Sequence, residues 1–296
     1  MALVVASTIV FPDGKFAYAS TPSAGSCSNS SGEIICNVEN EDLSFSRTSS
    51  DNQNTTVVDI LAGALVGDSA RYESVFVGDG GTVVDALVTV TQIPSGSSDV
   101  DQYDDGGSWG QDPIIMFPGT GSLTISVDFV DDSDNSVKMQ NLQVVVKDLD
   151  RDSRVEFAQF TGLTRYTLSS SPRTTLNVSE PSAGTKRFTG TANESVSDQA
   201  GWVVVDFPTV STVGLTGGHS SGSGGGIGFS FEGGTVLTNP ATSVDVAAAS
   251  YTVSFDLDGG SGSAPSAVSG AGELTFPSGA GQSKNGVNIA GWTALS

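Results

Sequence analysis

The chain has only one histidine in 296 residues, His219, and it lies in a Gly- and Ser-rich segment with no serine or cysteine motif near it. There is no G-x-S-x-G sequence, and the only two cysteines lie close together. Nucleophilic catalysis pairs a serine or cysteine with a base, so these absences argue against that class of enzyme. A glycosidase needs two carboxylates at a set separation, and the sequence does not place any two of its many acids that way. We therefore expect a protein that is not an enzyme.

Basic residues are scarce. Twelve Lys and Arg stand against 33 Asp and Glu, and the formal net charge is −21. Phosphate backbones and anionic lipid would be repelled by such a chain, which disfavours nucleic-acid and membrane-surface partners. Divalent cations are the natural partners of this surface.

Long runs of Ala, Leu, Glu and Lys are absent as well, which disfavours helices. Alternating or β-branched runs are separated by clusters of Gly, Asp, Ser and Pro, as strands joined by turns are. The sequence therefore predicts an all-β fold, an antiparallel β-sandwich or jelly-roll-like domain over residues 20–234. The predicted strands are 55–66, 70–78, 82–93, 121–130, 142–149, 154–160, 164–169, 174–179, 186–192, 201–207, 209–215 and 226–234. A short helix is the alternative for 55–66.

The N-terminal run MALVVASTIVF and the A-x-A-like Ala17-Tyr18-Ala19 predict a truncated signal peptide over residues 1–19. A basic region before the apolar run is missing, and a first β-strand is the alternative. No later segment is apolar enough to cross a membrane. Cys27 and Cys36, with turn residues between them, predict a disulfide across a hairpin and hence an oxidising, extracellular location.

The stretch KDLDRDSRVEF spaces four carboxylates like ligands of a calcium loop, and Ca²⁺ prefers six to eight oxygen ligands. It is not an EF-hand, because Ser153 stands where that loop needs glycine. Arg151 and Arg154 are interleaved, so a solvated turn with its own counter-charges is the alternative. The predicted calcium ligands are Asp148, Asp150, Asp152 and Glu156.

A second acidic stretch, residues 98–112, combines carboxylates with aromatic side chains on a Gly-rich loop. Sugar-binding loops use this combination, because rings stack on pyranose faces and carboxylates hold hydroxyls. The alternative is an exposed acidic loop whose tryptophan packs back onto the sandwich. The predicted ligand-binding residues are Asp101, Tyr103, Asp104, Asp105 and Trp109.

Two further stretches carry turn chemistry and no predicted site. Residues 128–136, DFVDDSDNS, predict a hairpin turn between two strands. Residues 216–234 are rich in glycine, but no Lys-Ser/Thr and no strand–loop–helix pattern accompany them. They predict a flexible hairpin tip at one end of the sandwich, followed by a linker over 235–250.

The last 46 residues, 251–296, resemble the Listeria–Bacteroides repeat, the B-repeat of internalin-type surface proteins. The resemblance rests on Val253, Phe255, Asp256, Gly259-Gly260, Leu274, Pro277, Gly286, Ile289, Gly291 and Trp292. Val287 and Ile289 stand where that family has aromatic residues, which alters the expected small core. The resemblance implies an incomplete β-grasp-like repeat that acts as a spacer in a surface protein and carries no chemistry.

These features predict a secreted cell-surface or adhesin-type protein, with a non-catalytic binding or stalk module that calcium stabilises and a cell-surface glycan or protein as ligand. The alternative is a carbohydrate-binding module of a larger extracellular enzyme that degrades polysaccharides.

Overall fold

The computed structural model describes most of the central part of the chain and short pieces near its end. One compact unit runs from Ala19 to Ala247, and the described residues from 250 on belong to another. The described ranges are 24–30, 32–45, 63–97, 102–104, 114–117, 120–195, 197–221, 226–235, 237–238, 240–247, 250–253, 266–271, 283–284 and 287–288. The predicted signal peptide, 1–19, lies outside them.

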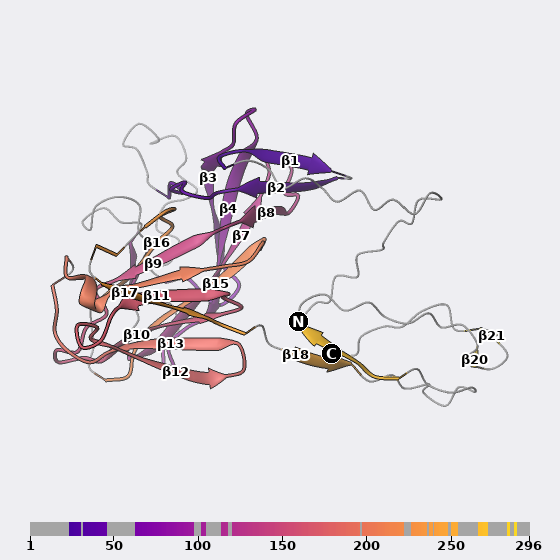
Figure 1. Ribbon diagram of the computed structural model, residues 1–296. Coiled ribbons are helices and arrows are strands. Elements are labelled where there is room, and N and C mark those ends of the chain that lie inside the picture. The colour runs from indigo at the N-terminus through magenta and orange to yellow at the C-terminus, as the bar shows by residue number, and fades with distance from the viewer. Residues whose placement is uncertain are drawn as a thin grey trace. The chain divides into compact units, whose positions relative to one another are not determined.

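Two seven-stranded antiparallel sheets build the larger unit (Figure 1). The first sheet has the order β12 (Leu176–Ser182), β13 (Thr185–Gly190), β10 (Glu156–Thr161), β15 (Thr212–His219), β7 (Gly121–Val130), β4 (Val83–Gln92) and β3 (Ser69–Val77). The second sheet has the order β17 (Ala241–Asp245), β11 (Arg165–Ser169), β14 (Val203–Asp206), β9 (Gln143–Lys147), β16 (Ile227–Ser230), β6 (Ile114–Phe117) and β5 (Gln102–Asp104). Each run predicted as a strand from residue 70 on overlaps a strand in these two sheets. Residues 55–62 of the first predicted run lie outside the described residues, and residues 63–66 form no strand.

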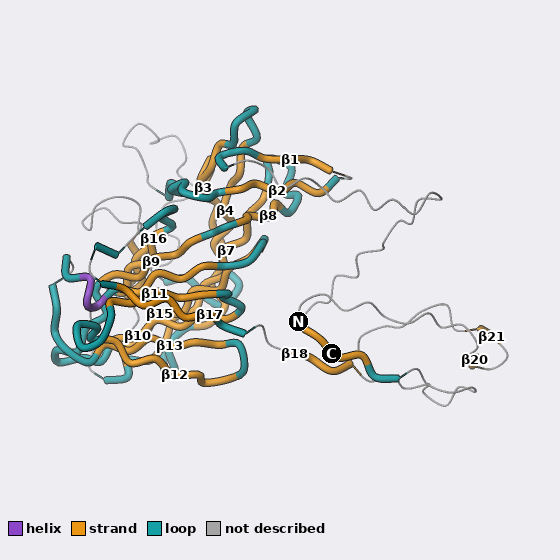
Figure 2. The backbone as a smooth tube through the Cα atoms, in the orientation of Figure 1, coloured by secondary structure: helices purple, strands orange, loops and turns teal. Residues whose placement is uncertain are grey.

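One hydrophobic core lies between the sheets. Strand β7 illustrates how the sequence forms this core. Apolar residues alternate with polar ones along β7, and every second side chain, from Leu123 to Phe129, is buried. Rings from both sheets meet there; Phe160 of β10 lies 5.8 Å from Phe229 of β16, centroid to centroid. The all-β sandwich predicted from alternation is therefore confirmed. Figure 2 shows strands throughout this unit and one short helical turn, η1 (Gln199–Gly201).

A small third sheet of order β1 (Cys27–Ser30), β2 (Glu33–Asn37) and β8 (Val137–Gln140) adjoins them. Strands β1 and β2 form a hairpin in which Cys27 faces Cys36, and the two are joined by a disulfide bond. The predicted disulfide is confirmed. Cys36 is fully buried in the main core, so the hairpin packs against the sandwich through this residue.

Two predicted connections are different in the structure. The glycine-rich stretch is not a hairpin tip, because β15, before it, lies in the first sheet and β16, after it, lies in the second. The predicted linker, 235–250, contains a paired strand, since β17 hydrogen-bonds along all of β11. The alternating pattern of β17 is too short and too polar to predict a strand from the sequence. The strand forms because the edge of β11 is free to pair with it.

The turn predicted over 128–136 is present. Asp131 accepts hydrogen bonds from the backbone N–H groups of Ser133 and Asn135, at 2.9 and 2.8 Å. After it, β8 leaves the first sheet and pairs in parallel with β2, so the turn connects two sheets and does not close a hairpin within one.

In the region of the predicted repeat, β18 (Ser250–Val253) pairs with β19 (Val268–Ala271), and β20 (Ser283–Lys284) pairs with β21 (Val287–Asn288). The glycine turn and Trp292 of the repeat lie outside the described residues. None of the described residues forms a helix long and apolar enough to span a membrane.

Candidate functional site: a buried carboxylate cluster beside a polar depression

The acidic loop, residues 148–156, carries the chain from β9 in the second sheet to β10 in the first. It does not continue β9, because Asp148 has a φ of 63°, in the left-handed region that aspartate tolerates better than most residues. The loop then folds back on itself: Arg151 bridges Val155, and the backbone N–H of Glu156 donates to the carbonyl of Asp150 at 3.0 Å. The alternating pattern of the sequence therefore does not produce a row of carboxylates on one strand face.

Asp152 lies apart from the other acids of the loop. Its Oδ1 accepts from the backbone N–H of Arg154 at 2.8 Å, and its Oδ2 lies 3.2 Å from the Arg154 guanidinium. The backbone hydrogen bond from Arg154, together with the positive charge of that side chain, lowers the pKa of Asp152. This is a local turn arrangement at the surface.

Glu156 is the centre of a buried cluster. Its side chain is only 4% exposed. Its Oε2 accepts from the backbone N–H of Asp150 at 3.1 Å, while its Oε1 lies 3.7 Å from Arg154 Nε and 3.9 Å from His219 Nε2. Within the described residues, both ring nitrogens of His219 and Oδ1 of Asp148 are buried without a hydrogen-bond partner.

Burial sets the protonation of this cluster. Removal from water raises the pKa of Glu156 to about 7, and the nearby charges of Asp150 and Asp148 add to that shift. Burial, followed by the charge of Asp150, raises the pKa of Asp148 to about 6. Burial lowers the pKa of His219, with Arg154 acting in the same direction. Near neutral pH, part of the repulsion among the carboxylates is therefore relieved by bound protons and part by Arg154.

The acidic loop also supports its neighbour, the serine loop, residues 191–198 between β13 and η1. Asp150 Oδ1 accepts from the backbone N–H of Glu194 at 2.8 Å, and the backbone N–H of Arg151 donates to the carbonyl of Ala192 at 2.9 Å. The two loops approach closely over Gly190, where an added Cβ would lie 2.5 Å from the carbonyl oxygens of both Leu149 and Asp150. The glycine permits this crossing.

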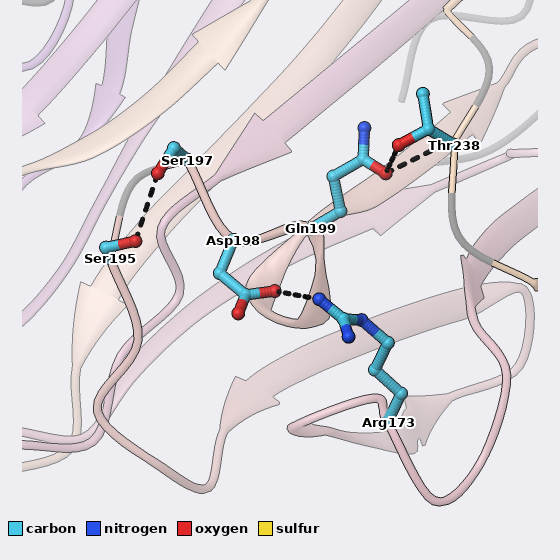
Figure 3. Close-up of a pocket in the computed structure, with 6 residues that line it drawn as sticks. All are labelled: Arg173, Ser195, Ser197, Asp198, Gln199 and Thr238. Atoms are coloured by element: carbon cyan, nitrogen blue, oxygen red, sulfur yellow. Dashed lines mark hydrogen bonds and ion pairs between the residues drawn. The ribbon is translucent and has the colours of Figure 1, made fainter.

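The serine loop forms one wall of a polar depression of about 320 Å³ (Figure 3). The other walls come from the turn after β11 and from the segment between β16 and β17. Its lining residues are Arg173, Ser195, Ser197, Asp198, Gln199 and Thr238.

Hydrogen bonds join the three walls of the depression. Asp198 Oδ1 accepts from Arg173 Nη2 at 3.1 Å and also caps η1 by accepting from the backbone N–H of Ala200 at 3.0 Å. Gln199 Oε1 accepts from both the backbone N–H and the hydroxyl of Thr238, at 2.8 and 3.0 Å. Figure 3 shows the Arg173–Asp198 bond and the two Gln199–Thr238 bonds.

The four predicted calcium ligands do not converge on one point. Asp152 faces outward, while Asp150 and Glu156 accept backbone hydrogen bonds inside. In the described ranges, no group of three or more His, Cys, Asp or Glu side chains is arranged to hold a metal ion. Calcium binding at Asp148 and its neighbours stays a prediction.

Of the predicted sugar-binding loop, Asp101, Asp105 and Trp109 lie outside the described residues. Tyr103 and Asp104 belong to the short edge strand β5, whose backbone pairs them with Met116 and Ile115 of β6. Ligand binding there also stays a prediction.

His219 was predicted to lie in a flexible hairpin tip, and that prediction is wrong. It is the last residue of β15 and stands in register opposite Glu156 on β10. The pair Gly217-Gly218 conceals the end of β15 in the sequence, because consecutive glycines are typical of loops. Gly218 is needed inside the sheet because a Cβ there would lie 2.4 Å from the carbonyl oxygen of Gly121 and 2.5 Å from the Phe157 ring.

No family model and no curated protein matches the chain. Among solved structures, the chain is similar to the N-terminal domain of the Streptococcus gordonii adhesin Sgo0707, with 10% sequence identity and a TM-score of 0.40. The match covers 56% of this chain and 49% of that one, so the chain spans about half the length of that structure. At this identity and TM-score the likeness carries no argument about function.

Proposed function

We propose that the protein is a secreted, cell-surface protein of the adhesin type whose sandwich is a non-catalytic binding or stalk module. The observation that carries the proposal is the Cys27–Cys36 disulfide, which links the two strands of the first described hairpin. Disulfides persist in oxidising compartments and are rare in the cytosol. The net charge of −21 agrees with a surface that avoids nucleic acid and anionic lipid.

The burial of the titratable cluster supports a non-catalytic role. Glu156 and His219 have the shifted pKa values that acid–base catalysts often have. A catalyst must reach its substrate, and these side chains are 4% and 0% exposed. In the part of the chain that the structure describes, Glu156 supports the acidic loop through the Asp150 N–H.

The B-repeat resemblance of residues 251–296 is part of the same proposal. The resemblance expects a strand that carries Val253 and Phe255; Val253 is the last residue of β18, which pairs with β19, and Phe255 lies outside the described residues. Flanking coding sequence with further repeats and a wall anchor would support the adhesin, whereas an adjoining glycosidase domain would support the second candidate.

The second candidate is a carbohydrate-binding module of an extracellular polysaccharide-degrading enzyme. The polar depression favours it, because hydroxyl, amide, carboxylate and guanidinium groups line it together. A hydrolysis assay on polysaccharides with this chain alone should show no activity under either candidate, and turnover would overturn the non-catalytic proposal.

The location is tested by expressing the chain in its natural host and fractionating the cells. We expect it outside the cytosol, with no free thiol titrated in the unfolded, unreduced protein. Two reactive thiols and a cytosolic location would overturn the proposal.

A further inference from the structure

The polar depression combines unused donors and acceptors with a fixed frame. Among the described residues, the Gln199 amide NH₂, Asp198 Oδ2 and the Arg173 Nε and Nη1 groups make no hydrogen bond, although their other atoms do. The hydroxyls of Ser195 and Ser197 bond only to each other, at 3.1 Å, and retain capacity for a further partner. The opening therefore presents both donors and acceptors to a ligand.

The frame is rigid before any ligand arrives. The turn that carries Arg173 is closed by a bond from its backbone N–H to the carbonyl of Ser170, and Ser170 in turn donates its N–H to the carbonyl of Pro240. The serine loop is held from below by the Asp150–Glu194 bond. A preformed site loses little conformational entropy on binding, which matters for ligands that make only polar contacts.

The chemistry of the lining selects the class of ligand. All six described lining side chains are polar, so an apolar ligand finds no partner. The charges of Arg173 and Asp198 offset each other, and the chain as a whole is strongly acidic, so an anionic ligand gains little. A sugar hydroxyl both donates and accepts, so a saccharide can use the donors and the acceptors of this lining together.

The volume of the depression agrees with a saccharide ligand. A volume of about 320 Å³ lies at the small end of ligand sites, which run from roughly 300 to 1,000 Å³. One or two sugar rings fill such a space.

We propose that this depression binds a neutral saccharide unit of a cell-surface or extracellular glycan. Arg173 and the Gln199 amide donate to ring and hydroxyl oxygens, Asp198 Oδ2 accepts from a hydroxyl, and the two serines complete the rim. The proposal rests on the proposed function as a non-catalytic binding module, and it names the site and the ligand class of that function.

The test uses the full chain and saturation-transfer NMR with cellobiose, maltose, lactose and N-acetyllactosamine as neutral probes and sialyllactose as an anionic one. We expect at least one neutral probe to bind with a dissociation constant in the millimolar range, and Arg173→Gln to weaken it at least tenfold. Ser195→Ala and Ser197→Ala, which touch no other described side chain, should each weaken it about two- to fivefold.

The chain offers a matched control in Arg165→Gln. Arg165 is 52% exposed and pairs with Asp206 at 2.8 Å, while Arg173 is 50% exposed and pairs with Asp198 at 3.1 Å. Arg165 begins β11, and the turn that carries Arg173 follows the other end of that strand. Arg165→Gln should leave saccharide binding unchanged, and thermal melts should show both variants folded.

Three outcomes would overturn the site. One is that no probe binds, and another is that sialyllactose binds more tightly than every neutral probe. The third is that a neutral probe binds equally to the parent chain, Arg173→Gln and both serine variants, which places binding elsewhere and leaves the module function intact. Failure of the proposed function itself is seen separately, as a cytosolic location with free thiols or as polysaccharide hydrolysis.

Discussion

Two Asp-rich stretches of this chain look alike in sequence and differ in chemistry. In the turn at 131–136, Asp131 accepts side-chain and backbone hydrogen bonds from Asn135 at the surface, and these bonds lower its pKa. In the acidic loop, burial raises the pKa of Glu156 to about 7 and that of Asp148 to about 6. The number of carboxylates is thus a poor guide to their behaviour, and solvent access decides whether they stay charged.

A buried leucine accounts for the difference in solvent exposure between the two stretches. Leu149 is fully buried in the middle of the acidic loop and draws the chain inward over Gly190. Residues 132–136 contain no apolar side chain and remain exposed. A change in the acidic loop, or in the glycine that it crosses, can therefore be compared with a matched change elsewhere.

The largest effect is expected from Gly190→Ala. The new Cβ would meet the Leu149 and Asp150 carbonyl oxygens at 2.5 Å, and backbone atoms cannot rotate away as a side chain can. Overpacking of this kind costs about 3 kcal/mol of unfolding free energy. Urea unfolding followed by tryptophan fluorescence measures it.

Gly214→Ala, in β15, is the matched control. Nothing lies within 4 Å of its added Cβ, and its φ is not in the left-handed region. We expect a change below about 1 kcal/mol, or a slight stabilisation, because alanine loses less backbone entropy than glycine. Equal losses at both positions would show that the acidic loop is not held tightly against β13.

The second effect concerns pH. Because the folded-state pKa values of Glu156 and Asp148 are raised, the folded protein holds more protons than the unfolded one between about pH 4 and 7. Their contribution to stability is full below the unfolded pKa values and is lost as the pH rises through 6 and 7. His219, with a lowered pKa, acts in the opposite direction below its unfolded value of about 6.5.

Glu156→Gln isolates the carboxylate, since glutamine still accepts from the Asp150 N–H and cannot ionise. Thermal melts at pH 4.5 and 8 should show the variant equal to the parent at acid pH and more stable by about 2 kcal/mol at pH 8. The facing charged groups are Asp148, Asp150, Arg154 and His219. Asp131→Asn should lose stability relative to the parent only above about pH 4, because a lowered pKa stabilises the ionised form. Parallel pH profiles for Glu156→Gln and the parent would contradict a buried, proton-holding Glu156.

The third effect is that of Asp150→Ala on the serine loop. It removes the 2.8 Å bond to the Glu194 N–H, which costs about 1.5 kcal/mol. Hydrogen exchange should speed up at the Glu194 amide and in residues 197–201. Asp131→Ala should leave those amides unchanged, and unaltered exchange in Asp150→Ala would show that the acidic loop does not support the depression.

The smallest effect is expected from calcium. Binding at the predicted ligands requires Asp150 and Asp152 to exchange backbone hydrogen bonds for the ion, so the stabilisation at millimolar calcium should be about 1 kcal/mol. Melts in calcium and then in chelator measure it, and Asp150→Ala should abolish the rise while Asp131→Ala keeps it. An unchanged midpoint in the parent chain would remove calcium from this loop and leave protons and Arg154 as the neutralising groups.

By itself the sequence determined the long strands of the sandwich, the sandwich class and the disulfide, because period-two alternation in runs such as 121–130 and two cysteines flanking a turn are local patterns. It also singled out the acidic loop. It did not reveal the polar strand β17, which forms by pairing with β11. Only the tertiary structure decided that Asp152 faces water while Glu156 faces His219, since that depends on β10 pairing with β15, 56 to 63 positions further along the chain. Likewise, only the tertiary structure created the polar depression, because Arg173 and Thr238 come to residues 195–199 from two other segments of the chain. The sequence sets the neighbours of a carboxylate along the chain, but the packing of other segments against it sets its solvent exposure.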